Sequence, residues 1–196
     1  MELLVARVIP AEFQAILKAS IAETASLVRV TGVLPTPQGP RVQWELSGPP
    51  DPADTKLTEA ELRDVAEAAS RYLAVRWRDS AEPWPVPPQH WDILSKLHPR
   101  IYDVSIETGP GWHWLLVMTA EWMSEGGLPS NFKTAQVKEK FGGLRFYHDG
   151  TRRTLRIARA AEQLSFGVCE ICGTPGRLRK GGWTRTLCDE HDPKQR

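Results

Sequence analysis

Four residues near the C-terminus have the spacing of a metal site: Cys169 and Cys172, followed by Cys188 and His191. Two residues separate the members of each pair, and the two pairs are joined by a segment of hairpin length. Three thiolates and one imidazole are donors that zinc prefers, and two such pairs can surround the ion as a tetrahedron. The sequence therefore predicts a module at 167–196 that folds around a structural zinc ion.

The segment between the two pairs fits this interpretation. Gly173 follows the second cysteine, where a tight turn favours a residue without a side chain. Residues 177–180 and 183–187 can pair as short strands across Gly181 and Gly182. This arrangement resembles a treble-clef or a zinc-ribbon module, and the spacing does not choose between them. The chain has 3 cysteines and the site uses all of them, so we do not expect a disulfide framework.

The rest of the chain alternates helical and strand patterns, which predicts an α+β fold. The N-terminal region is expected to be a helix, a hairpin and a helix; the C-terminal region is expected to contain a second hairpin and a basic helix. The expected elements are a helix at 10–23, strands at 25–34 and 41–47, a helix at 59–77, a strand at 101–106, a helix at 112–125, strands at 133–139 and 144–148, and a helix at 151–165. Thr58 and Glu61 form a capping-box pattern at the start of the second helix.

A proline-rich stretch divides the chain. Residues 83–88 contain four prolines, which neither a regular helix nor a central strand accepts. We therefore predict an N-terminal region at 1–78, a connector at 79–90, a second region at 91–166 and the zinc module at 167–196.

The net charge of +1 hides a basic C-terminal part. Arg152, Arg156 and Arg159 recur at helical spacing and share one face, whereas Leu155, Ala158, Ala161 and Leu164 are expected on the buried side of this helix. The predicted zinc hairpin adds Arg179, Lys180 and Arg185. Together these six residues could bind phosphates, with Trp183 available to stack on a base. The alternative is that the arginines are simply solvated and that Trp183 covers the zinc core.

Several other functions are disfavoured by the sequence. The segment 173–187 lacks the His, Asp, Glu and Asn residues that a metal-dependent nuclease would need there. The signatures of zinc deaminases, zinc proteases and phosphate-binding loops are missing. His148 and Asp149 could act as an acid–base pair, but such a pair more often marks a turn. The sequence thus favours a non-catalytic binding protein, and no catalytic residue is assigned. The acid and arginine near the N-terminus argue against a signal peptide and favour the cytoplasm.

The segment Lys138–Tyr147, with the sequence KEKFGGLRFY, resembles the signature of a family of uncharacterised small proteins of bacteria and their phages. Further matches are Gly111-Trp112, the helix end at 161–165 and the two ligand pairs, so the resemblance covers 105–192. It implies a phage or prophage setting and a zinc site, without a known activity. The segment itself predicts a hairpin that buries Leu144 and Phe146 and places Arg145 and Tyr147 on the opposite, outer face.

Two functional hypotheses follow from these patterns. The first is association with nucleic acid through the six basic residues. The second is a protein-interaction module, such as a phage-encoded inhibitor or an accessory factor of a host complex. The high tryptophan content supports this second hypothesis, since large aromatic side chains anchor protein interfaces.

Overall fold

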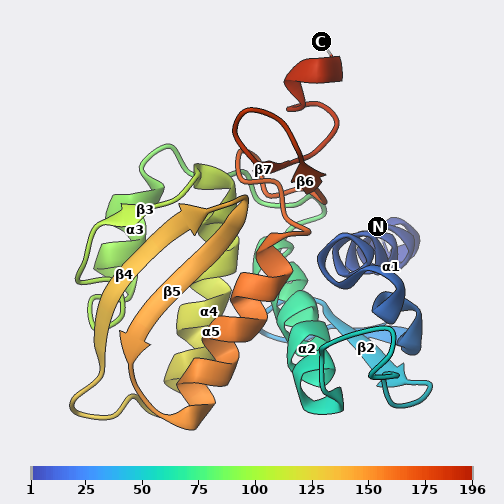
Figure 1. The fold of residues 1–196 in the computed structure, drawn as a ribbon, viewed down its shortest axis with the longest axis horizontal. Helices are drawn as coiled ribbons and strands as arrows, with labels where there is room; N and C mark the ends of the chain where they lie inside the picture. The colour runs from blue at the N-terminus through green and yellow to red at the C-terminus, as the bar shows by residue number, and fades with distance from the viewer. Residues whose placement is uncertain (1, 196) are drawn as a thin grey trace.

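The computed structural model describes residues 2–195, which form a mixed α/β fold (Figure 1). In chain order the elements are α1 (Glu2–Ile21), η1 (Ala22–Leu27), β1 (Val28–Leu34), β2 (Arg41–Leu46), α2 (Glu59–Arg76), α3 (His90–Leu97), β3 (Ile106–Glu107), η2 (Pro110–Trp112), α4 (His113–Glu125), β4 (Lys133–Lys140), β5 (Gly143–Asp149), α5 (Arg152–Ser165), β6 (Arg177–Arg179), β7 (Arg185–Leu187) and η3 (Pro193–Gln195). The predicted mixture of helices and strands is confirmed.

The strands form three small sheets. β1 and β2 pair antiparallel beside α1 and α2, and β4 pairs antiparallel with β5 and parallel with β3 (Figure 1). The third sheet, β6–β7, lies beyond the ends of α5 and the β4–β5 hairpin, next to the C-terminus (Figure 1). The predicted burial of Leu144 and Phe146 on one face of β5 is confirmed.

A continuous hydrophobic core joins the regions that the proline-rich stretch separates in the sequence. It contains Phe13 of α1, Leu73 of α2, Leu116 of α4 and Ile157 of α5. The connector has no helix or strand between 79 and 89, yet its backbone is tied to the body of the protein, since the Trp114 indole donates to the Trp84 carbonyl. The predicted regions therefore share one core.

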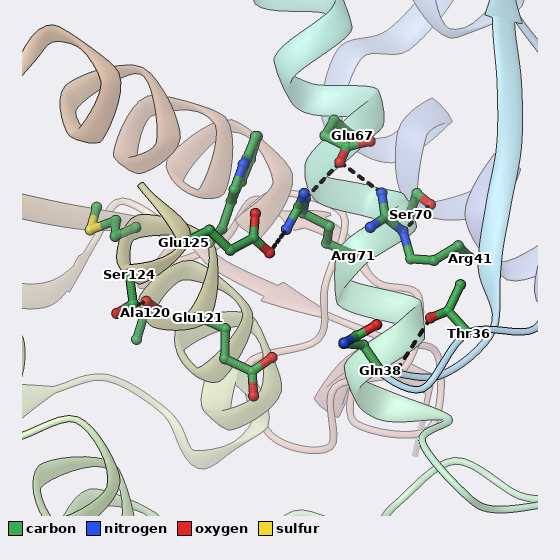
Figure 2. A network of polar contacts seen from close by, with 12 residues as sticks. Thr36, Gln38, Arg41, Glu67, Ser70, Arg71, Ala120, Glu121, Ser124 and Glu125 are labelled. Carbon is green, nitrogen blue, oxygen red and sulfur yellow. Dashed lines mark hydrogen bonds and ion pairs between the residues drawn. The ribbon is translucent and has the colours of Figure 1, made fainter. Parts of the chain in front are cut away.

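Polar contacts reinforce this union at the surface. Arg71 of α2 forms ion pairs with Glu67 on the same helix and with Glu125 of α4 (Figure 2). Arg41 of β2 reaches the same Glu67 at 2.7 Å and also donates to Ser70. One carboxylate thus connects the first hairpin to α2, and the Arg71 pairs continue the network to α4.

The capping box at the start of α2 is confirmed. The Thr58 hydroxyl accepts from the Glu61 backbone N–H, and the Glu61 carboxylate accepts from the Thr58 backbone N–H at 2.9 Å. These reciprocal bonds satisfy two backbone donors at a helix end that would otherwise lack partners.

Two predictions, about the first helix and about the strand at 101–106, were wrong. The first helix begins at Glu2 and carries Pro10 in its interior, because Ile9 and Phe13 are fully buried on both sides of the proline and their burial outweighs the lost hydrogen bond. The predicted strand at 101–106 is reduced to Ile106–Glu107. Ile101 and Tyr102 are buried in a turn instead, where their backbone N–H groups donate to His98.

Two further boundaries differ from the predictions. The first strand begins at Val28 rather than residue 25, because the 3-10 helix η1 occupies Ala22–Leu27. The helix α3, which has eight residues, begins two residues after Pro88 and buries Leu94, was not predicted. So short an apolar pattern gives little periodicity to detect.

Candidate metal centre and the neighbouring hairpins

The four predicted ligands come together in one cluster. One ligand atom of each of Cys169, Cys172, Cys188 and His191 lies within 4.8 Å of the others. His191 Nδ1 is 3.1 Å from Cys188 Sγ and 3.7 Å from Cys169 Sγ, and the sulfurs of Cys172 and Cys188 are 3.8 Å apart. A tetrahedral ion with sulfur and nitrogen ligands holds its donors about 3.5–3.8 Å apart, so this cluster could hold such an ion.

The backbone around the first ligand pair forms a tight turn. The Gly173 N–H donates to the Cys169 carbonyl at 2.9 Å, and Gly173 has a φ of 75°. A side chain there would be strained by this φ and would crowd the Gly111 carbonyl and the Tyr72 hydroxyl. The predicted requirement for glycine after the second cysteine is therefore confirmed.

The charge of the cluster suits a cation. Hydrogen bonds from the Cys169 and Thr174 side chains lower the pKa of Cys172, which favours the thiolate form of this sulfur. Cys169 is fully buried and the other ligands are half-buried. Four protein donors complete a tetrahedron and leave no position for a substrate, which is the pattern of a structural site.

The first ligand turn is anchored to the body of the protein. The buried Tyr72 hydroxyl of α2 donates to the Gly173 carbonyl, and the Trp112 indole donates to the Val168 carbonyl at 2.9 Å. The Gly111 N–H adds a bond of 2.8 Å to the Glu170 carbonyl. These contacts couple the metal cluster directly to α2 and η2.

The β4–β5 turn contacts the β6–β7 hairpin, which lies between the two ligand pairs. The Thr186 hydroxyl of β7 donates to the Gly142 carbonyl at 2.6 Å, and the Gly142 N–H donates to the Glu139 carboxylate at 2.6 Å. Phe141 and Gly142 have φ values of 54° and 77°, and the flanking Lys140 and Gly143 are paired. Two consecutive residues with positive φ between paired strands form a tight two-residue turn that is fixed on both sides.

Two aromatic side chains are strongly exposed at these hairpins. The Phe141 side chain is 71% exposed, with Lys140 Nζ 5.4 Å from its ring centroid, and Trp183 in the β6–β7 loop is 76% exposed. The interpretation in which Trp183 covers the zinc core is therefore wrong. Its neighbours Gly181 and Gly182 leave open space around the loop.

The six basic residues predicted to bind nucleic acid have different surroundings. Three of them form ion pairs: Arg156 with Asp64, Arg179 with Asp189 and Asp192, and Arg185 with Glu170. Among the described residues, Arg152, Arg159 and Lys180 have no carboxylate within ion-pair distance. Sequence periodicity could not reveal the partners, since Asp64 lies on another helix, 92 residues from Arg156.

Two smaller predictions about this surface also changed. Leu155, expected on the buried side of the basic helix, is 42% exposed, whereas Ala158, Ala161 and Leu164 are buried as predicted. Both ring nitrogens of His148 are buried without a hydrogen-bond partner, and the ring lies between the rings of Phe132 and Phe146. This environment lowers the pKa of His148 through burial and separates its nitrogens from solvent.

No family model, curated protein or solved structure matches this chain. Along the described part of the chain, none of the helices has the length and apolar character needed to cross a bilayer.

Proposed function

We propose that this protein is a zinc-stabilised, non-catalytic binding protein that associates with single-stranded nucleic acid. The proposed contact surface, called the hairpin-tip surface below, consists of Lys140, Phe141, Leu178, Lys180 and Trp183. These residues lie on the β4–β5 turn and on the β6–β7 hairpin, whose Leu178 side chain and Arg185 backbone adjoin Gly142.

The observation that carries the proposal is the pair of exposed rings near two lysines that form no ion pair with the residues that the structure describes. Proteins that bind single strands stack bases on aromatic side chains and place cations along the phosphates. Phe141 and Trp183 expose their rings to solvent, and the exposed Lys140 and Lys180 lie one and three residues before them in the chain. Stacking does not depend on base identity, so we expect little sequence preference.

The predicted arginine surface has a smaller part in this proposal. Arg156, Arg179 and Arg185 are engaged by carboxylates, and a phosphate would have to compete with those ion pairs. Of the six predicted residues, Lys180 belongs to the hairpin-tip surface. Arg152 and Arg159 are exposed and could add only long-range attraction, which salt screens.

A protein partner is the competing proposal, and the composition of the surface argues against it. The centres of protein interfaces are rich in aromatic residues but poor in lysine. Here both aromatic side chains are flanked by exposed lysines, Lys140 before Phe141 and Lys180 before Trp183. A phage-encoded inhibitor or accessory factor would instead present an apolar centre with a charged rim.

The metal supports this surface indirectly. We propose that zinc occupies the cluster, because three thiolates and an imidazole match its preferred donors, and that the module is of the treble-clef or zinc-ribbon type. The ion would fix β6–β7, and hence Leu178 and Trp183, against the β4–β5 turn. Free cysteines are most common in reducing compartments, and we propose a cytoplasmic location on this ground.

Binding of a fluorescently labelled oligothymidine or oligouridine, followed by anisotropy at several salt concentrations, tests the proposal. We expect Phe141→Ala and Trp183→Ala each to weaken binding about tenfold, because a stacked base contributes about 1–3 kcal/mol. Lys180→Glu should weaken binding and reduce its salt dependence. Trp91→Ala, which removes an exposed indole from α3, is the control and should bind normally.

Two results would overturn the proposal. One is an affinity for either oligonucleotide no higher than that for a neutral polymer. The other is binding that both aromatic substitutions leave unchanged. A stoichiometric complex with a purified protein that is lost in Phe141→Ala, without any oligonucleotide binding, would establish the competing proposal instead.

A further inference from the structure

A groove of about 340 Å³ lies between α2 and α5, next to Arg145 near the start of β5. The two helices run side by side below the metal cluster (Figure 1). Three arginines and three carboxylates line the groove together with apolar side chains; the charged residues are Glu61, Asp64, Arg145, Arg156, Arg159 and Glu162. Its volume is at the lower end of the range for small-molecule sites, about 300–1,000 Å³.

Each carboxylate in the groove is already engaged by a donor. Glu61 closes the capping box at the start of α2, and Asp64 holds Arg156 through two hydrogen bonds of 2.8 and 2.7 Å. Glu162 accepts from the Phe146 backbone N–H at 2.7 Å. Burial raises the pKa of Glu162, whereas the Phe146 N–H and the nearby Arg145 and Arg159 lower it.

Two guanidinium groups in the groove form no ion pair with the described residues, although both attract the Glu162 carboxylate at longer range. Arg145 donates to the Leu144 carbonyl and lies over the Phe166 ring, 5.9 Å from its centroid. Arg159, from α5, has no ion pair among the residues that the structure describes. Both line the groove, so an anion bound there could accept hydrogen bonds from two guanidinium groups that belong to different elements.

The remaining wall is apolar. Leu57, Val65, Ala160 and Phe166 line the groove beside the two arginines. The Phe166 ring packs against the strand at Gly143, where a Cβ would lie 2.4 Å from the ring and 3.0 Å from the Arg145 guanidinium. Glycine at 143 therefore makes room for both the ring and the cation.

From this arrangement we infer that the groove binds a small organic anion, with a carboxylate or phosphate group between Arg145 and Arg159 and an apolar body against Phe166 and Leu57. This site is separate from the hairpin-tip surface and uses none of its residues. Guanidinium forks recognise planar and tetrahedral oxyanions alike, so the two acid groups belong to one ligand chemistry.

Isothermal titration calorimetry with phenyl phosphate and with benzoate tests the inference and distinguishes the two acid groups. Benzyl alcohol, which has the ring without the charge, and inorganic phosphate, which has the charge without the ring, are the matched probes. We expect binding of at least one aromatic anion and at least tenfold weaker binding of both matched probes.

Substitutions locate the site. Arg145→Gln and Arg159→Gln should each weaken binding of the aromatic anion at least tenfold, whereas Arg152→Gln, on the same helix outside the groove, should not change it. A thermal melt of each variant checks that it remains folded. Failure of both aromatic anions to bind would overturn the inference. Equal binding by the folded Arg159→Gln protein, or equal affinity for inorganic phosphate, would do so as well.

Discussion

Phe141 combines an unfavourable backbone conformation with an exposed side chain. Its φ of 54° belongs to the left-handed region, which costs a side-chain-bearing residue about 1–2 kcal/mol. At 71% exposure the ring recovers little of that cost through burial. Asn or Gly is the usual residue at this position of a two-residue hairpin turn. Backbone strain that packing does not compensate is typical of functional positions.

Replacing Phe141 with Asn should therefore separate stability from binding. We expect Phe141→Asn to raise the free energy of unfolding by about 0.5–1 kcal/mol, since Asn tolerates the left-handed region better. The same substitution should weaken oligonucleotide binding as much as Phe141→Ala does. Urea denaturation of the metal-loaded protein and anisotropy measure the two effects. A destabilised Phe141→Asn protein would show that the ring contributes to packing instead.

At the scale of elements, a single hydroxyl links the β4–β5 turn to β7. Thr186 is fully buried and donates to the Gly142 carbonyl. Thr186→Val keeps the volume but leaves this carbonyl without its donor, so we expect a loss of about 1–3 kcal/mol in the free energy of unfolding. Thr184→Val, on the same hairpin and partly exposed, is the control. Equal stability of the two variants in denaturant titrations would contradict the proposed link.

The contact between α3 and α4 is sensitive to acid. His90 and His113 are buried, their rings lie 6.0 Å apart, and burial lowers the pKa of each to about 4. Both are thus neutral in the folded protein at pH 7. As the pH falls below about 6.5, the unfolded chain takes up protons that the folded protein binds only near pH 4. The free energy of unfolding should therefore decrease across this window.

The double variant His90→Gln/His113→Gln isolates this effect. Urea titrations at pH 7 and pH 5 should show a smaller loss of stability in the variant than in the original protein. Protonation of the metal ligands should weaken metal binding by the same amount in both proteins. The difference between their losses of stability therefore reports the two histidines. A parallel decrease in the two proteins would mean that these histidines are exposed or paired in solution.

At the scale of the whole molecule, local patterns predicted more than long-range ones. The ligand spacing, the capping box and the β4–β5 hairpin depend on residues close in sequence, and each was predicted correctly. The charge pattern of α5 also predicted its buried side, except for Leu155. The acidic partners of Arg156 and Arg185 lie on other segments, so no periodicity in α5 or in the hairpin could indicate them.

The groove between α2 and α5 could not be predicted from the sequence for the same reason. It depends on α2, α5 and β5 meeting in space, and its apolar wall comes from two stretches far apart in the sequence, 57–65 and 160–166. Arg145 was assigned to the outer face of the hairpin, which is correct for the strand but gives no information about the neighbouring helix. Tertiary packing, rather than local propensity, creates this site.

Metal removal should affect the core as well as the C-terminal module. The turn at 169–173 is bonded to Tyr72 of α2, to Trp112 and to Gly111, so loss of the ion releases contacts made by three buried groups. Structural zinc contributes on the order of 10 kcal/mol in isolated fingers, and we expect chelation to lower the melting temperature substantially.

Hydrogen exchange followed by mass spectrometry, before and after chelation, can show how far this change extends. We expect faster exchange at 167–192, at 110–112 and in the last turns of α2 around Tyr72, because these segments contact the ligand turn directly. The β1–β2 hairpin, which has no such contact, is the internal control. Cys188→Ser should show the same exchange pattern without chelator and no further change with it. If chelation increased exchange only at 167–192, the metal cluster would fold independently and its bonds to α2 and η2 would not contribute to stability.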